Sequence, residues 1–93
     1  MTIIECQKVE IMFINRASNG LNNICGANIA VTRKEMGLSQ RQLADLAQLA
    51  GLDIDKNAIQ RIEAGKRFIT DIELITLSKI LHKSYDELLK IRE

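Results

Sequence analysis

The side chains best suited to specific polar recognition share the outer face of one short helical segment, and they are Lys56, Asn57, Gln60 and Arg61. Ile59 and Ile62 fall on the inner face of the same segment. An Asn amide pairs through two hydrogen bonds with adenine, and an Arg or Lys cation pairs with the acceptor edge of guanine. Polar side chains on a short helix are more often only a solvated surface. The surrounding sequence therefore has to decide between these two interpretations.

Residues suited to catalysis or metal binding are scarce. The single histidine, His82, lies far along the chain from Cys6 and Cys25, and the two cysteines lack the spacing of metal ligands. Neither a Ser/Cys–His constellation nor a glycine-rich phosphate loop is evident. We therefore expect no enzyme, no metal and no cofactor. The lack of a signal peptide and of an apolar run of about 20 residues predicts a cytoplasmic protein with reduced thiols and no membrane partner.

Capping signals define the elements that must position the polar face. Three expected helix starts carry a capping box, a Ser or Thr followed three residues later by Gln or Glu, at Ser39, Thr70 and Ser84. Asp55 is expected to cap a further helix that runs to about residue 64. Three helices are expected to end at glycines, namely Gly37, Gly51 and Gly65. With a first helix over 27–36, these signals predict an all-α domain of five short helices.

Apolar residues at three- and four-residue spacing predict which side of each helix is buried. In the second helix the expected buried residues are Leu43, Ala44, Leu46, Ala47 and Ala50. In the fourth helix they are Ile72, Leu74, Ile75, Leu77, Ile80 and Leu81. In the fifth helix they are Tyr85, Leu88, Leu89 and Ile91. The predicted core is therefore aliphatic, in agreement with an aromatic content of 3%.

Residues 1–22 are predicted to form an N-terminal arm, followed by a domain over 23–93. The apolar run 9–14 is compatible with either a strand or a short helix. The Asn-rich stretch 15–23 is expected to be a turn or linker. The apolar content of the arm suits packing on a partner subunit. A leader without a fixed structure, with Met12 as an alternative start, is the other interpretation.

Three motifs follow one another within residues 27–91: GLSQxxLA from Gly37, IxxIExGKR from Ile59, and LxxLSxxL from Leu74 with a later Glu-Leu-Leu. This order resembles the Cro/C1-type (XRE-family) helix-turn-helix domain. The resemblance implies a five-helix, lambda-repressor-like fold and DNA binding, as in bacterial and phage repressors, activators and antitoxins. Gly51 follows Ala44 by seven positions, where the family usually has about four. Either the second helix is longer or the turn is wider than usual.

The resemblance also assigns roles to the polar side chains. The third helix would enter the major groove of DNA, with its base-reading positions at Lys56, Asn57 and Arg61, and with Gln60 between base and phosphate contacts. Phosphate contacts would come from the start of the second helix and from the residues after the third, namely Gln40, Arg41, Lys66 and Arg67. In the first and third helices, Arg33 and Glu63 match a family pair and predict a structural salt bridge. Two unrelated surface charges, worth less than about 1 kcal/mol, are the alternative.

The formal net charge of +1 is low for a protein that binds nucleic acid, so the distribution of charge matters more than its sum. Five basic residues are expected to share the DNA face: Arg41, Lys56, Arg61, Lys66 and Arg67. Asp55 is expected to be the only acid near them. The face would then be basic although the chain is nearly neutral.

Together these features predict a small transcription regulator, expected to act as a repressor, that binds double-stranded DNA sequence-specifically. One short recognition helix gives limited affinity, so we expect a homodimer on a two-fold-related operator. The dimer contact would be the fifth helix or the N-terminal arm. The alternative, which the apolar arm favours, is an antitoxin or a protein-interaction adaptor with the same fold and a toxin or another protein as its partner.

Overall fold

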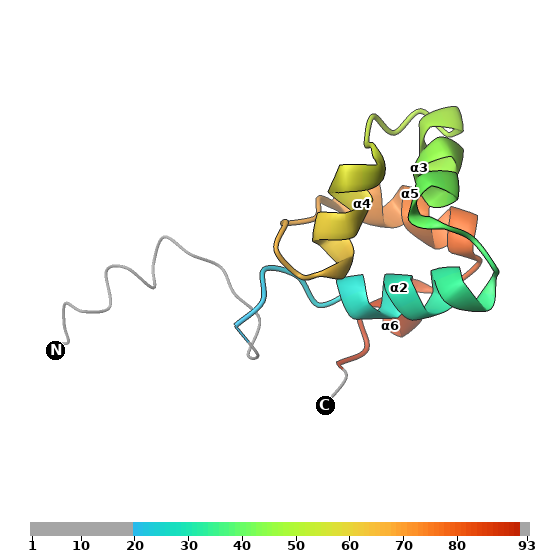
Figure 1. Ribbon diagram of the computed structural model, residues 1–93. Coiled ribbons are helices and arrows are strands. Elements are labelled where there is room, and N and C mark those ends of the chain that lie inside the picture. Colours follow the sequence, from blue (N-terminus) through green and yellow to red (C-terminus); the bar gives the residue numbers. More distant parts are fainter. Residues whose placement is uncertain (1–19, 92–93) are drawn as a thin grey trace, which may run out of the picture.

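The computed structural model describes residues 20–91, and every regular element in that range is a helix. The helices are α2 (Gly26–Glu35), α3 (Gln40–Leu49), α4 (Lys56–Glu63), α5 (Asp71–Leu81) and α6 (Tyr85–Leu88). In Figure 1, α3 and α4 stand side by side above α2, α6 lies below α2, and α5 passes behind. The predicted all-α domain of five helices is confirmed.

The helix starts follow the capping signals of the sequence. Ser39, Thr70 and Ser84 each form both hydrogen bonds of the capping box, so each satisfies amide groups that a helix start leaves unpaired. Asp55 caps α4, where its Oδ1 accepts a hydrogen bond of 2.8 Å from the Ala58 N–H. The bounds of the helices are therefore set locally, before any tertiary contact is considered.

The inner face of α4 is fixed in the core. Ile59 and Ile62 are fully buried and pack in one cluster with Leu43, Ala44 and Ala47 of α3. Burying an Ile or Leu side chain completely contributes about 1.5–3 kcal/mol. The same cluster includes further side chains from the other helices, namely Cys25, Ile29, Ile54, Leu77, Leu81 and Leu88. A rotation of α4 about its axis would withdraw its two isoleucines from this cluster, so the orientation of its outer face is determined.

Several residues that the apolar pattern placed in the core are exposed. On α5, Ile72 is 67% and Ile75 is 41% exposed, because the helix turns Glu73, Leu77 and Leu81 inward at four-residue intervals. The other exposed members of the predicted set are Leu46, Ala50, Tyr85, Leu89 and Ile91. For these residues the prediction was wrong. Where α5 is apolar on several sides, the pattern does not identify the side that meets its neighbours.

The connection between α3 and α4 shows where the additional residues lie. Position 48, where a glycine four residues after Ala44 would fall, is still helical, and α3 ends only at Leu49. Gly51 then takes a backbone φ of +92°, a conformation that residues with a Cβ rarely adopt. Gln48 closes the turn, because its Nε2 donates a hydrogen bond of 2.8 Å to the Ile54 carbonyl oxygen. The helix thus continues past the expected position of the turn glycine, and residues 50–55 form the connection to α4.

The segment that leads into α2 is bound to the C-terminal end of α4. The Asn22 N–H donates to the Gly65 carbonyl oxygen at 2.8 Å, and Asn22 Nδ2 donates to the Lys66 carbonyl oxygen at 3.0 Å. Asn23 Nδ2 donates to the carbonyl oxygens of Ile62 and Arg67, at 3.0 and 2.8 Å. The two residues therefore form part of the folded domain, whereas the predicted arm contacts of residues 1–19 lie outside the described residues.

Candidate nucleic-acid interface

The outer face of α4 carries the four side chains that the sequence singled out. Lys56, Asn57, Gln60 and Arg61 are all exposed, opposite the two buried isoleucines. Asp55 fixes the start of this helix through its cap, so the side chains of the first turn have a defined backbone beneath them. The helix thus presents amide and cationic groups to solvent from a rigid support.

A hollow lies on each side of the first turn of α4. The first, of about 270 Å³, is lined from α3 by Arg41, Ala44, Asp45 and Gln48 and from the start of α4 by Asp55, Lys56 and Asn57. The second, of about 360 Å³, is lined by Asp53, Ile54, Asp55, Asn57, Ala58, Arg61 and Arg67. Because Asn57 borders both hollows, the start of α4 stands out between them as a ridge. Such a ridge suits insertion into the major groove, which admits an α-helix.

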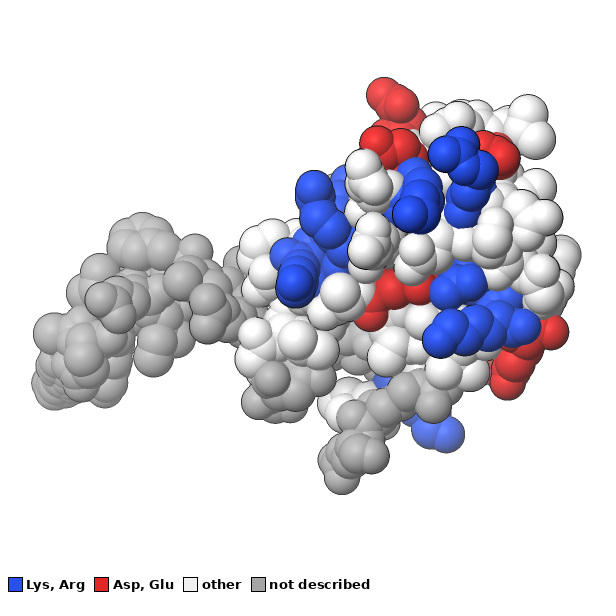
Figure 2. Space-filling model, viewed as in Figure 1, with Lys and Arg blue, Asp and Glu red and all other residues white. Residues whose placement is uncertain are grey.

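The charge on this face is mixed rather than uniformly basic. Figure 2 shows Lys and Arg side chains over α3 and α4, with Asp and Glu side chains among them. The two hollows are bordered by three exposed acids, Asp45, Asp53 and Asp55. The prediction that Asp55 is the only acid near this face was wrong, because Asp45 of α3 and Asp53 of the following turn also border the hollows beside α4. These carboxylates reduce the general attraction of the face for phosphate.

Arg33 and Glu63 form a nearly buried ion pair between α2 and the end of α4. Arg33 Nε lies 2.6 Å from Glu63 Oε2, Nη2 lies 3.0 Å from Oε1, and the side chains are 10% and 7% exposed. Arg33 Nη1 also donates to the Leu38 carbonyl oxygen at 2.8 Å, and Gln40 Nε2 donates to Glu63 Oε1 at 3.0 Å. The hydrogen bond to Glu63 raises the pKa of Arg33. This network joins α2, the start of α3 and the end of α4.

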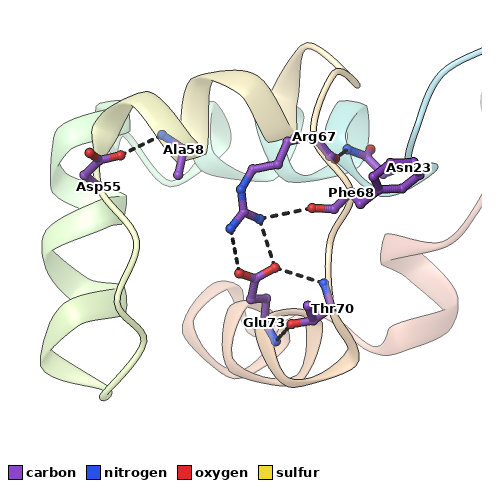
Figure 3. Close-up of polar contacts among 7 residues, drawn as sticks. All are labelled: Asn23, Asp55, Ala58, Arg67, Phe68, Thr70 and Glu73. Carbon is purple, nitrogen blue, oxygen red and sulfur yellow. Dashed lines mark hydrogen bonds and ion pairs between the residues drawn. The ribbon is translucent and has the colours of Figure 1, made fainter.

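The four residues that were expected to contact phosphate fall into two groups. Arg41 and Lys66 are exposed at the start of α3 and just after α4. The side chain of Gln40 is engaged by Glu63, and that of Arg67 by Glu73 of α5. In Figure 3 the Arg67 guanidinium lies against Glu73, with Nη1–Oε1 and Nη2–Oε2 both at 2.9 Å, and Nη1 also donates to the Phe68 carbonyl oxygen at 3.1 Å.

Sequence reasoning missed the residues that hold the loop after α4. Asn22 and Asn23 were assigned to a linker, and Glu73 only to a capping box. Asn23 interacts with carbonyl groups 39 and 44 positions away, a separation at which no local pattern reports a contact. For Glu73, its position six residues after Arg67 was the available signal, but it indicates a pair only once the turn between them is known.

Comparison with protein families identifies the domain. A family model described as helix-turn-helix matches residues 29–88, about two thirds of the chain. The chain belongs to the Cro/C1-type (XRE) helix-turn-helix family. Its members are DNA-binding transcription regulators. Searches of curated proteins and of solved structures find no significant match.

Among residues 20–91, no helix is both long and apolar enough to cross a membrane. Within the same residues, His, Cys, Asp and Glu side chains form no group of three or more that could hold a metal ion.

Proposed function

We propose that this chain is a transcriptional repressor that binds double-stranded DNA sequence-specifically, with α4 in the major groove. The observation that carries the proposal is the division of α4 into two faces. Its isoleucines are locked in the core, and its outer face presents Lys56, Asn57, Gln60 and Arg61 on a ridge between two hollows. A helix held in this way can present side chains to base edges without losing much conformational freedom on binding.

The proposed base contacts follow from the chemistry of these side chains. Asn57, in the first turn, would pair with adenine, and Arg61, one turn later, with guanine. Lys56 would reach guanine acceptors from the edge of the ridge, and Gln60 would lie between bases and backbone. Each well-formed bidentate contact is worth about 1–3 kcal/mol of discrimination against the wrong base.

Arg41 and Lys66 are the proposed phosphate contacts. They are exposed and flank the recognition helix, Arg41 in the first turn of α3 and Lys66 directly after the end of α4. At Gln40 the proposed contact is through the backbone, because the first N–H groups of α3 and the helix dipole favour an anion. The Gln40 amide remains with Glu63.

A homodimer on a two-fold-related operator forms part of the proposal. A recognition helix of 8 residues reads only a few base pairs, so a second copy is needed for tight and specific binding. Half-sites would lie about 34 Å apart, one turn of DNA. Exposed apolar side chains at and after α6, namely Tyr85, Leu89 and Ile91, supply surface for the contact between copies. Repression would follow where the operator overlaps the site that RNA polymerase uses.

The test is binding to DNA duplexes over a salt series, followed by selection of bound sequences from a random duplex library. We expect binding that weakens steeply with salt and a selected site with two-fold symmetry. No binding at low salt, or binding that does not change with salt, would contradict the proposal. That result would favour the second candidate, an antitoxin or protein-interaction adaptor, for which the three carboxylates on the α3–α4 face are the supporting observation.

A further inference from the structure

The loop between α4 and α5 carries the two basic residues Lys66 and Arg67 side by side, but their side chains have different surroundings. Lys66 is exposed, whereas the side chain of Arg67 is 25% exposed and lies against the 10%-exposed side chain of Glu73. We propose that Arg67 positions this loop through Glu73 and does not contact DNA, so that Lys66 alone binds phosphate here. The inference rests on the proposed DNA-binding function.

The hydrogen bonds of Arg67 and Glu73 leave little of either group for a ligand. Both terminal nitrogens of Arg67 are bonded to Glu73, and Nη1 also donates to the Phe68 carbonyl oxygen (Figure 3). Glu73 Oε1 accepts a further hydrogen bond of 2.9 Å from the Thr70 N–H. A phosphate that captured Arg67 would have to displace a carboxylate from a bidentate pair and leave that carboxylate nearly buried without its cation.

The charges around Arg67 also argue against phosphate binding by this residue. The Arg67–Glu73 pair carries no net charge, so it exerts little attraction on a phosphate at a distance. The hydrogen bond from Arg67 is the largest cause that lowers the pKa of Glu73, and therefore the carboxylate stays ionised at neutral pH. The charge of Asp55 also acts on Arg67 and adds to the negative surroundings of the guanidinium.

The loop is held from both sides, with Lys66 in the middle. On one side, Asn22 bonds the carbonyl oxygens of Gly65 and Lys66, and Asn23 bonds that of Arg67. On the other side, the Arg67 side chain reaches Glu73 at the start of α5. The backbone of Lys66 is thus fixed by its two neighbours, and its side chain projects from a defined point at the end of the recognition helix. Arg67 contributes by fixing this geometry.

The experiment compares Arg67→Lys, Arg67→Ala, Glu73→Gln and Lys66→Ala with the unaltered chain. The probes are a random-sequence duplex and the best duplex from library selection, each titrated over a salt series. We expect Arg67→Lys, Arg67→Ala and Glu73→Gln each to weaken binding of the selected duplex by a similar factor, about three- to thirtyfold. This is the size of effect that residues have when they influence a binding site without contacting the ligand. Their salt slopes should equal that of the unaltered chain. Lys66→Ala should instead reduce the slope by about 0.9, the loss of one phosphate contact.

A phosphate contact by Arg67 would give the opposite pattern, which overturns the proposal. Arg67→Lys would then bind nearly as well as the unaltered chain, since Lys also binds phosphate. Arg67→Ala would reduce the salt slope, and Glu73→Gln would strengthen binding of both duplexes by removing a negative charge. Glu73→Gln is the sharpest variant, because it keeps the shape of the side chain and its acceptor for the Thr70 N–H.

Amide exchange in the free protein separates this inference from the proposed function. If the unaltered chain binds neither duplex, the proposed function fails, but the positioning role still predicts a result without DNA. Arg67→Lys should speed hydrogen exchange at three backbone amides. The Thr70 amide donates to the Glu73 carboxylate, the Asn22 amide to the Gly65 carbonyl oxygen, and the Lys66 amide to the Arg61 carbonyl oxygen. Exchange in α3 should stay unchanged. Unaltered exchange at all three of these amides would by itself overturn the positioning role.

Discussion

Arg33 of α2 and Glu63 at the end of α4 share a bidentate ion pair in which neither side chain is more than 10% exposed. Glu63 also accepts from Gln40, and Arg33 also donates to the backbone at Leu38. The pair thus connects α4 to α2 and to the start of α3. Its position distinguishes it from a surface ion pair, which would contribute little.

Arg33→Ala should lower the free energy of unfolding by about 3 kcal/mol, because it leaves the Glu63 carboxylate nearly buried without its cation. Urea denaturation measures this loss. Specific DNA binding should weaken as well, since the end of α4 loses its attachment to α2. Lys34→Ala, at the exposed neighbouring position, is the matched control and should change neither quantity. If Arg33→Ala leaves both stability and DNA affinity untouched, the pair has no structural role.

Arg61→Ala and Lys66→Ala should separate base reading from phosphate contact. Arg61→Ala should lower affinity for the selected duplex by about 1–3 kcal/mol and relax the preference at one base pair, with little effect on random duplex. Lys66→Ala should weaken every duplex alike and reduce the salt slope by about 1. Fluorescence anisotropy over a salt series measures both quantities. An Arg61→Ala effect of equal size on all sequences would place Arg61 on the backbone instead.

The elements of the fold were predictable wherever the decisive interaction is local. Ser39, Thr70 and Ser84 bond to amides three residues away, so the helix starts could be identified from the sequence alone. The two-sided character of α4 was visible for the same reason, because Ile59 and Ile62 recur at three-residue spacing.

The rest depends on how the helices meet, which no local pattern contains. Ile72 and Ile75 are as apolar as Leu77, and only the packing of α5 against its neighbours decides that they remain exposed. Similarly, Asn23 looks like a linker residue until α2 and the end of α4 are placed together. The basic face was overestimated because the side of α3 that meets α4, which carries Asp45, is known only once the two helices are placed together.

Gly26, at the start of α2, lies close against the backbone at the end of α4. A Cβ at this position would lie 2.0 Å from the Ile62 carbonyl oxygen, a backbone atom that cannot move alone. Gly26→Ala should therefore lower the free energy of unfolding by about 1–3 kcal/mol. Helix propensity alone would favour alanine by about 1 kcal/mol, so the sign of the effect is informative. Urea denaturation decides the matter, with Ala27→Gly as the control that isolates propensity, and a stabilised Gly26→Ala variant would contradict the close approach.

Cys25 should make stability depend on alkaline pH. Burial raises the pKa of its thiol from 9.0 to about 11. The folded state therefore holds the thiol proton more tightly than the unfolded state. Its contribution to stability is complete below pH 9 and is lost as the pH rises towards 11. Urea midpoints measured from pH 7 upward should fall more steeply for the unaltered chain than for Cys25→Ala. Parallel curves for the two proteins would show that the thiol is accessible to solvent.

His82 ends α5 in the left-handed region, with φ of 55° and ψ of 41°. It is the one residue other than glycine with a positive φ among residues 20–91. A residue with a Cβ adopts this backbone conformation at a free-energy cost of about 1–2 kcal/mol, and glycine avoids that cost. Part of the gain is offset because glycine has more freedom in the unfolded chain. His82→Gly should therefore raise the free energy of unfolding by about 1 kcal/mol in urea denaturation.

Lys79→Gly, inside the same helix, is the control and should lower the free energy of unfolding by about 1 kcal/mol. A destabilised His82→Gly variant would mean that the imidazole makes a compensating contact.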